Sequence, residues 1–242
     1  MKTQFSNDQY EKIYDDTMQF HYWNLYRNNF ILTQIKKFNL DNILDVGSGR
    51  GIVTNYLYTK NITIQGVELG DTTSIIKGLV APISFNTDVF TLDKNLPIST
   101  ITLFDVIEHL EHPIDFINRL ILHFNNLKTI LITVPARQEL WTNFDEFNGH
   151  FKRYHLGNLK NDFKNCKGTI IYQQYFFHIL YYIIWFNKKI LNQNRKIDFS
   201  RNKPMNFILK NFHKTIANLF KLEKYLFSKT SKGSSIIILI KV

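Results

Sequence analysis

Short apolar runs alternate with amphipathic stretches along much of this chain. Over 8–38 the apolar positions recur at helical spacing without an interrupting Gly or Pro, which predicts an N-terminal helix. Apolar runs of strand length follow at 42–46, 63–68, 83–86, 98–104 and 128–134, and helical stretches lie among them at 53–58, 73–79 and 114–125. Strands that alternate with helices predict crossover connections and a parallel sheet covered on both faces.

The C-terminal part has a different pattern. Segments 169–177 and 235–242 are rich in β-branched and aromatic residues, and we expect them to pair as an antiparallel edge. The residues between them look helical and basic. We therefore divide the chain into an N-terminal helical cap (1–40), a core (41–177 and 234–242) and a basic, aromatic helical insert (178–233).

The net charge of +10 is distributed unevenly. Residues 1–150 carry 12 Lys and Arg against 17 Asp and Glu, a balance of −5, whereas 151–242 carry 18 against 3, a balance of +15. A basic C-terminal part suits an anionic partner, such as a phosphorylated substrate, nucleic acid or an acidic membrane face. Lysines spread over a solvated helix face are the alternative interpretation.

Length and cysteine content narrow the class of protein. The 242 residues suit one well-buried α/β domain with additions. The single cysteine, Cys166, excludes an internal disulfide and a thiolate-rich metal site. The polar start of the chain has no apolar stretch of the kind a signal peptide needs, so we expect a cytoplasmic protein.

A glycine-rich turn, Gly47-Ser48-Gly49-Arg50-Gly51, joins the first predicted strand to the next helix. Glycine permits positive φ and lets a ligand approach the bare backbone, and amides at a helix N-terminus point into the crevice at the sheet edge. Ile52 stands where the dinucleotide fingerprint needs a small residue, which argues against NAD or FAD. Glu68, at the end of the second strand, is placed to accept both hydroxyls of a ribose. The alternative interpretation is that the glycine-rich turn only connects the strand to the helix and binds no ligand.

A second motif, Asp105-Val106-Ile107-Glu108-His109, follows the fourth predicted strand. With the glycine turn, it makes the chain resemble the class I S-adenosylmethionine (AdoMet, SAM) dependent methyltransferases, in particular the branch with an Asp-Val-Leu-Glu-His box at this place. The likeness continues through 133–136, 149–154 and 233–235. The chain departs from many relatives at Ser48, where they have Cys or Ala, and at 98–99, where they have Phe-Asp. Neither change removes a cofactor contact.

The resemblance implies a Rossmann-like, seven-stranded mixed sheet whose last strand is antiparallel, with AdoMet lying across the C-terminal ends of the first, second and fourth strands. Together with the apolar pattern, it predicts an α/β fold of this kind with the helical cap and the insert before the last strand. Carried over to this sequence, the family's cofactor positions are Asp45, Gly47, Ser48, Gly49 and Gly51 for the methionine part, Arg27 for its carboxylate, Glu68 for the ribose, Asp88 for the adenine amino group and Asp105 near the sulfonium.

Methyl transfer is an in-line displacement at a carbon already activated by the sulfonium, so the protein mainly aligns the reactants. A hydroxyl acceptor would benefit from a base, and histidine suits that role at neutral pH. We name His109 and His150 as candidates, with Asp145 as a third catalytic residue. The alternative interpretation of the loop after the fifth predicted strand is a structural ion pair between Asp145 and Arg153. A zinc site of Asp145, His150 and His155 has no recognisable ligand spacing, so we expect no metal.

Residues 168–187 carry no formal charge, and this length would allow a membrane-spanning helix. The segment begins in the predicted sixth strand and contains Gln173, Gln174 and His178, which argues against a span. An interfacial helix is the second interpretation, with a basic side facing anionic lipid. A lid that lines the acceptor pocket is the third. The basic residues of the interfacial interpretation are Lys188, Lys189, Arg195 and Lys196.

These observations predict an AdoMet-dependent methyltransferase that modifies a small-molecule or lipid-like acceptor at oxygen, with nitrogen as an alternative atom. Its location would be the cytoplasm or the surface of a membrane. A nucleic-acid methyltransferase is permitted by the basic half, but the Asn/Asp-Pro-Pro-aromatic box and an RNA-binding module are not found in the sequence. A non-catalytic AdoMet-binding protein is the remaining alternative.

Overall fold

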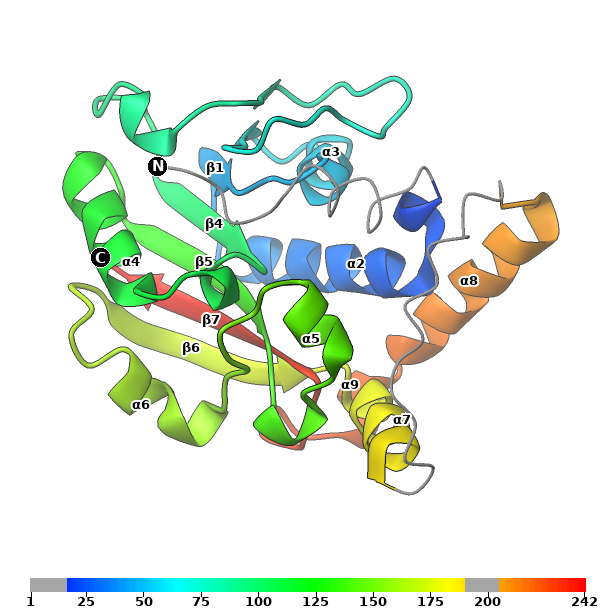
Figure 1. Ribbon diagram of the computed structural model, residues 1–242. Coiled ribbons are helices and arrows are strands. Elements are labelled where there is room, and N and C mark those ends of the chain that lie inside the picture. Colours follow the sequence, from blue (N-terminus) through cyan, green and yellow to red (C-terminus); the bar gives the residue numbers. More distant parts are fainter. Residues whose placement is uncertain (1–16, 190–204) are drawn as a thin grey trace. The chain divides into compact units, whose positions relative to one another are not determined.

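The computed structural model describes residues 17–189 and 205–242. Its seven strands belong to one mixed sheet with the order β3-β2-β1-β4-β5-β7-β6 (Figure 1). The last strand, β7, is antiparallel to β5 and to β6. The predicted Rossmann-like α/β fold is therefore confirmed. The described residues form two compact units, 17–92 with 205–222, and 93–189 with 223–242.

The first unit has a three-stranded parallel edge. Strand β1 pairs with β2 from Ile43 opposite Ile64, and β2 pairs with the short β3. All four residues of β1 are buried, as expected for a parallel strand covered on both faces. The elements of this unit are η1 (Met18–Phe20), α2 (Tyr22–Lys37), β1 (Ile43–Val46), α3 (Ile52–Tyr58), β2 (Ile64–Val67), β3 (Ile83–Ser84), η2 (Val89–Thr91) and α8 (Phe207–Phe220).

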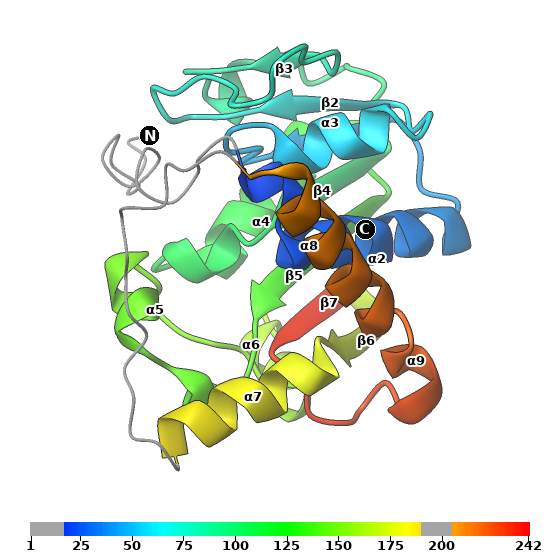
Figure 2. The same ribbon diagram turned by 90° about the vertical axis from the view of Figure 1, so that its right-hand side faces the viewer.

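Helices α2 and α8 of this unit pack against each other (Figure 2). Aromatic side chains contribute to the contact. The Tyr22 ring stacks on His213 and on Phe220, each with a centroid distance of 5.8 Å. The Tyr22 amide also donates to Nδ1 of His213 over 3.3 Å. The segment 205–222, from the predicted insert, is thus anchored on the N-terminal helix.

The second unit has the remaining four strands. Strand β5 pairs in parallel with β4 and antiparallel with β7, and its five central residues are buried. A register shift between Ile170 and Tyr172 interrupts the β6–β7 ladder. The elements are β4 (Thr100–Phe104), η3 (Ile107–His109), α4 (Pro113–His123), β5 (Thr129–Pro135), η4 (Gln138–Leu140), α5 (Asn143–Phe147), η5 (Leu156–Asn158), α6 (Leu159–Asp162), β6 (Thr169–Phe176), α7 (His178–Lys189), α9 (Glu223–Leu226) and β7 (Ser235–Lys241).

Two predicted helices differ from the structure. Residues 73–79 do not form a helix, because the side chain of Ser74 accepts from the Ile76 amide and Gly78 adopts a φ of +74°. Both residues place the backbone in turns, which compete with a helix over these positions. The N-terminal helix begins only at Tyr22, since His21 is extended and caps it. Residues 8–16 of that prediction, and Arg195 and Lys196 of the insert, lie outside the described residues.

The uncharged stretch 168–187 divides between strand β6 and helix α7. Within 17–189 and 205–242, none of the helices combines the length and apolar character needed to cross a bilayer. The segment boundaries drawn from the sequence, 1–40, 41–177 with 234–242, and 178–233, stay a prediction.

Candidate functional site

The glycine turn of the first unit has the backbone that its sequence predicts. Gly47, Gly49 and Gly51 all have positive φ, at +76°, +55° and +88°. Gly51 caps helix α3, and a Cβ there would lie 2.8 Å from Cδ1 of Ile83. A Cβ on Gly49 would meet nothing within 4 Å. The turn is therefore tight at Gly51 and open at Gly49.

Glu68 ties this turn to the end of β2. One carboxylate oxygen accepts from the Gly49 amide and the other from the Gly70 amide, both over 2.7 Å. Glu68 is only 5% exposed. The side-chain oxygen of Ser48 is buried, and the described residues offer it no hydrogen-bond partner. A buried hydroxyl with unused bonding capacity in an open glycine turn fits a polar ligand.

Asp45, Asp88 and Arg27 have local partners in the same unit. Asp45 is buried and accepts from the Thr54 hydroxyl over 2.6 Å, which fastens α3 to β1. Asp88 accepts from the Phe90 amide and starts η2. Arg27 is buried on α2, with its guanidinium 4.9 Å from the centre of the Trp23 ring. The structure therefore joins Glu68 to the glycine turn, while the ligand roles of these three stay predictions.

Asp105 of the second unit follows β4 with a φ of +56°, which is uncommon for a residue with a Cβ. Its amide donates to the Thr133 carbonyl over 2.9 Å, and its carboxylate accepts from the Thr133 hydroxyl over 3.2 Å. Left-handed backbone at a non-glycine residue costs of order 1–3 kcal/mol and clusters at functional sites. These two bonds hold the start of the Asp105–His109 box on strand β5.

The two histidines predicted from the sequence lie together in this unit. His109 ends the η3 turn and His150 follows α5, and their ring centroids are 4.7 Å apart in an edge-to-face arrangement. Glu108, buried beside His109, places a carboxylate oxygen in the same cluster, with all three potential ligand atoms within 4.8 Å of one another. Glu108 belongs to the Asp105–His109 box but was not among the catalytic residues predicted from the sequence. Its burial, invisible in the sequence, is what distinguishes it.

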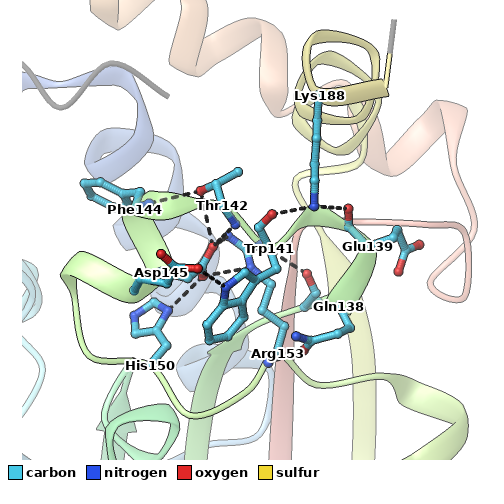
Figure 3. Close-up of polar contacts among 11 residues, drawn as sticks. Gln138, Glu139, Trp141, Thr142, Phe144, Asp145, His150, Arg153 and Lys188 are labelled. Carbon is cyan, nitrogen blue, oxygen red and sulfur yellow. Dashed lines mark hydrogen bonds and ion pairs between the residues drawn. The ribbon is translucent and has the colours of Figure 1, made fainter. Parts of the chain in front are cut away.

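Asp145 organises the loop that has His150 (Figure 3). One of its oxygens lies 2.9 Å from Nδ1 of His150 and 2.8 Å from Nε of Arg153, and the other accepts from Nη2 of Arg153 over 3.0 Å. The same carboxylate closes a capping box with Thr142 at the start of α5. The ion pair of Asp145 with Arg153, which was the alternative interpretation of the sequence, and a contact of Asp145 with His150 therefore coexist.

Burial favours the neutral form of both Asp145 and His109, but only His109 becomes neutral. Burial raises the pKa of Asp145, but hydrogen bonds from His150 and Arg153 outweigh it and lower this pKa to about 2. Burial, together with the nearby His150, lowers the pKa of His109 to about 4, against a smaller opposing effect of Asp105. At neutral pH the loop therefore holds a carboxylate beside His150 and a neutral imidazole at His109.

Other residues close to His150 in the sequence have separate contacts. Lys152 pairs with Asp162 over 3.0 Å, and its ammonium lies 4.5 Å from the centre of the Tyr154 ring. His155 does not join the histidine pair, since its Nε2 lies 2.6 Å from Arg137. Lys152 and His155 therefore do not take part in the contacts around Asp145.

Helix α7 is fastened to the same loop. The Lys188 ammonium donates to the backbone carbonyls of Glu139 over 3.1 Å and Trp141 over 2.5 Å (Figure 3). The Tyr181 hydroxyl reaches the Glu139 carboxylate over 3.3 Å. Lys188, which the sequence assigned to a lipid-facing side, instead makes an intramolecular contact. This favours the interpretation of α7 as a cover packed on the loop.

Residues 19–166 match the model of a family described as a methyltransferase domain, and the match spans more than half of the chain. The chain belongs to this methyltransferase family. No curated protein sequence matches this methyltransferase.

Several solved structures have a similar fold. The methyltransferase domain of bacterial CtHen1-C gives a TM-score of 0.53 at 12% identity, with 90% of this methyltransferase and 98% of that chain covered. Coclaurine N-methyltransferase, bound to N-methylheliamine and SAH, gives 0.52 at 8% identity, with 89% and 70% covered. A SAM dependent methyltransferase from Archaeoglobus fulgidus gives 0.49 at 17% identity, with 89% and 94% covered. The first two establish a shared methyltransferase fold.

Proposed function

We propose that this methyltransferase moves the sulfonium methyl group of AdoMet to an oxygen atom of a small-molecule or lipid-like acceptor. Its methyl donor is S-adenosylmethionine. The observation that carries the proposal for the acceptor is the His150–Asp145 pair beside the neutral His109. The glycine turn with Glu68 supports the donor half.

The residues of the first unit fit an AdoMet nucleoside. Glu68 accepts from the amides of Gly49 and Gly70, which fixes its carboxylate beside the glycine turn, and a carboxylate is an acceptor of the kind that ribose hydroxyls need. The open side of Gly49 leaves room for the ligand against bare backbone, and Ser48 supplies an unused hydroxyl. When bound, AdoMet supplies an electrophilic methyl group that needs no further activation. The chain's own task is then to orient the nucleoside and exclude water.

The second unit supports an oxygen acceptor. In His150, Nδ1 faces Asp145, so the ring orientation is fixed and Nε2 is the nitrogen that remains for a substrate proton. A carboxylate behind an imidazole also stabilises the charge that appears when the ring takes up a proton. An amine acceptor loses its proton more readily after methylation and needs such a base less. The histidine pair therefore favours oxygen over nitrogen.

The proposal is tested first by calorimetric titration with AdoMet and with its demethylated product. One binding site for each is expected, and no heat of binding with either would contradict the donor assignment. Transfer of labelled methyl groups into a fractionated cell extract then tests the acceptor. Label in small-molecule or lipid fractions, stable to acid as an ether and absent from RNA, is expected. Label only in RNA would indicate a nucleic-acid methyltransferase. AdoMet binding without any transfer of label would indicate a non-catalytic AdoMet-binding protein.

A membrane surface is the partner that we propose for helix α8. Ile208, Phe212 and Leu219 form an exposed apolar stripe on this helix, and Phe207 at its start is also exposed. Its basic residues include the exposed Lys214. An exposed apolar stripe flanked by basic residues is typical of helices that lie in the interface of an anionic bilayer. A lipid-like acceptor would be found at such a surface.

Flotation with vesicles tests this partner. We expect recovery with vesicles that contain anionic lipid and little recovery with neutral ones, because the basic residues contribute about 1 kcal/mol each near an anionic surface. Phe212→Ser should lower the recovery, whereas Asn211→Ser, an exposed polar position on the same helix, should not. Equal recovery of both variants and the parent chain would show that α8 is not the contact.

A further inference from the structure

Three side chains of the second unit converge in a way that ordinary packing does not require. Glu108 and His109 are adjacent in the η3 turn, and His150 comes from the loop after α5. One carboxylate oxygen and one nitrogen from each ring lie within 4.8 Å of one another. A carboxylate with two imidazoles is a donor set that binds first-row divalent ions.

Each histidine ring has a hydrogen-bond partner outside the three-residue cluster. Nδ1 of His150 faces Asp145, which itself is gripped by Arg153 at both oxygens. His109 hydrogen-bonds to backbone at Asn148 and Gly149. Ligating histidines almost always have such outer partners, which fix the ring and direct the other nitrogen to the ion.

Two buried oxygens near this cluster add a second indication. The hydroxyl of Tyr154 and the side-chain oxygen of Asn148 are buried, and neither finds a hydrogen-bond partner in the part of the chain that the structure describes. Tyr154 lies close enough to Glu108 for the two side chains to interact electrostatically. Buried polar atoms without partners are rare and often mark an unoccupied water or ion position.

We propose that Glu108, His109 and His150 bind one divalent first-row transition-metal ion, of the manganese, iron, cobalt or zinc type. Three protein ligands leave coordination positions open, as in catalytic and unlike structural sites. This inference rests on the proposed function and changes one step of it. His150 serves as a ligand, and the ion takes over activation of the acceptor hydroxyl. The site differs from the zinc set considered in the sequence, because His155 bonds to Arg137 instead.

The chemical step then balances without an external reactant. The acceptor hydroxyl binds the ion, which lowers its pKa, and its proton passes to solvent. The new C–O bond forms as the C–S bond of AdoMet breaks, and the neutral thioether leaves. No oxidation change occurs at the ion. Its two functions are to position the acceptor oxygen and to stabilise the alkoxide or phenoxide character of that oxygen.

Metal binding is measurable on the full chain without AdoMet or acceptor. After treatment with a chelator and its removal, titration with Mn²⁺, Zn²⁺ and Co²⁺ should show one site per chain. Co²⁺ should develop visible absorption of a nitrogen- and oxygen-ligated ion. Mg²⁺ and Ca²⁺ should bind more weakly, because imidazole suits the transition ions. Absence of a stoichiometric site for all three transition ions would overturn the proposal.

The variants are matched within a few residues. Glu108→Gln and His109→Gln each remove one ligand and should weaken Co²⁺ binding by at least about 10-fold, the lower limit for losing an outer partner. Glu111→Gln and His112→Gln change exposed residues of the same types three positions later and should bind like the parent chain. If all four variants bind alike, the ion lies elsewhere. Metal binding without methyl transfer would leave this site standing and contradict only the proposed function.

Discussion

The glycine turn of the first unit and the histidine loop of the second show two ways to form a site. The turn uses backbone: three glycines with positive φ, and a carboxylate that accepts from the amides of Gly49 and Gly70. The loop uses side chains from two segments, His109 after β4 and His150 after α5. The turn therefore depends on glycine itself, whereas the loop depends on the single buried carboxylate of Asp145, which holds His150 and Arg153.

The largest effect is expected from breaking that dependence. Arg153→Met leaves the Asp145 carboxylate buried with only His150 and Thr142 as partners, and removing one member of a buried ion pair costs about 3–5 kcal/mol. Chemical denaturation should show this loss in the free energy of unfolding. Lys152→Met is the control, because the Lys152–Asp162 pair is partly exposed and should contribute under about 1 kcal/mol. Equal effects of the two variants would show that Asp145 does not organise the loop.

Glu68→Ala should give the next effect, on cofactor affinity. Each charge-assisted hydrogen bond to the ribose contributes about 1.5–3 kcal/mol, so one lost bond weakens binding at least about tenfold. Titration calorimetry with AdoMet measures the change, and a thermal melt verifies that the variant is folded after its two amide contacts are lost. Asp71→Ala, which removes an exposed carboxylate three residues later, should leave the affinity unchanged. Parent-like affinity of Glu68→Ala would mean that the ribose lies elsewhere.

Two alanine substitutions separate steric fit from backbone strain within the turn. Gly51→Ala combines left-handed backbone with a Cβ 2.8 Å from Ile83, and should cost about 2–3 kcal/mol of unfolding free energy. Gly49→Ala has the strained φ but open space, and should cost about 1–2 kcal/mol. Gly49→Ala should nevertheless weaken AdoMet binding, since its Cβ points into the space that we assign to the ligand. A larger loss of stability at Gly49 than at Gly51 would contradict this division.

The smallest expected effect is on the pH dependence of stability in the second unit, to which His178 contributes. Burial lowers the pKa of His178, and hydrogen bonds to the backbone of Lys232 and Ser231 only partly offset it. A folded-state pKa below the unfolded value of 6.5 means that the unfolded chain binds more protons. Stability is then complete above about pH 6.5 and decreases as the pH falls. His178→Gln should flatten this decrease between about pH 7.5 and 5.5, and an unchanged slope would assign it to other groups.

The sequence predicted the sheet well because its strands are apolar on both faces. Residues 43–46 and 129–135 form buried runs that only a covered parallel or central strand accommodates. The glycine turn and Glu68 were also predictable, since their geometry is local or set by adjacent strands. The helix expected at 73–79 failed because Ser74 and Gly78 satisfy the backbone in turns, a competition that apolar spacing does not record.

The histidine loop could be predicted only in part. His109, His150 and Asp145 were named by residue type and by their position after strands, but the contact of the two histidines joins segments that are separated in the sequence by α4, β5 and α5. Glu108 was missed because the sequence does not say which residues of the 3₁₀ turn are buried. Lys188 looked like a lipid-facing charge until its carbonyl contacts were visible.

Helix α7 is held by its ends. The amides of His178 and Ile179 at its start donate to the buried carboxylate of Glu223, and Lys188 at its finish binds two carbonyls. Both contacts match the sign of the helix dipole. A helix braced in this way owes little of its stability to its outer side, where Ile183 and Phe186 are exposed. Those positions can therefore exchange one side chain for another while the scaffold stays intact.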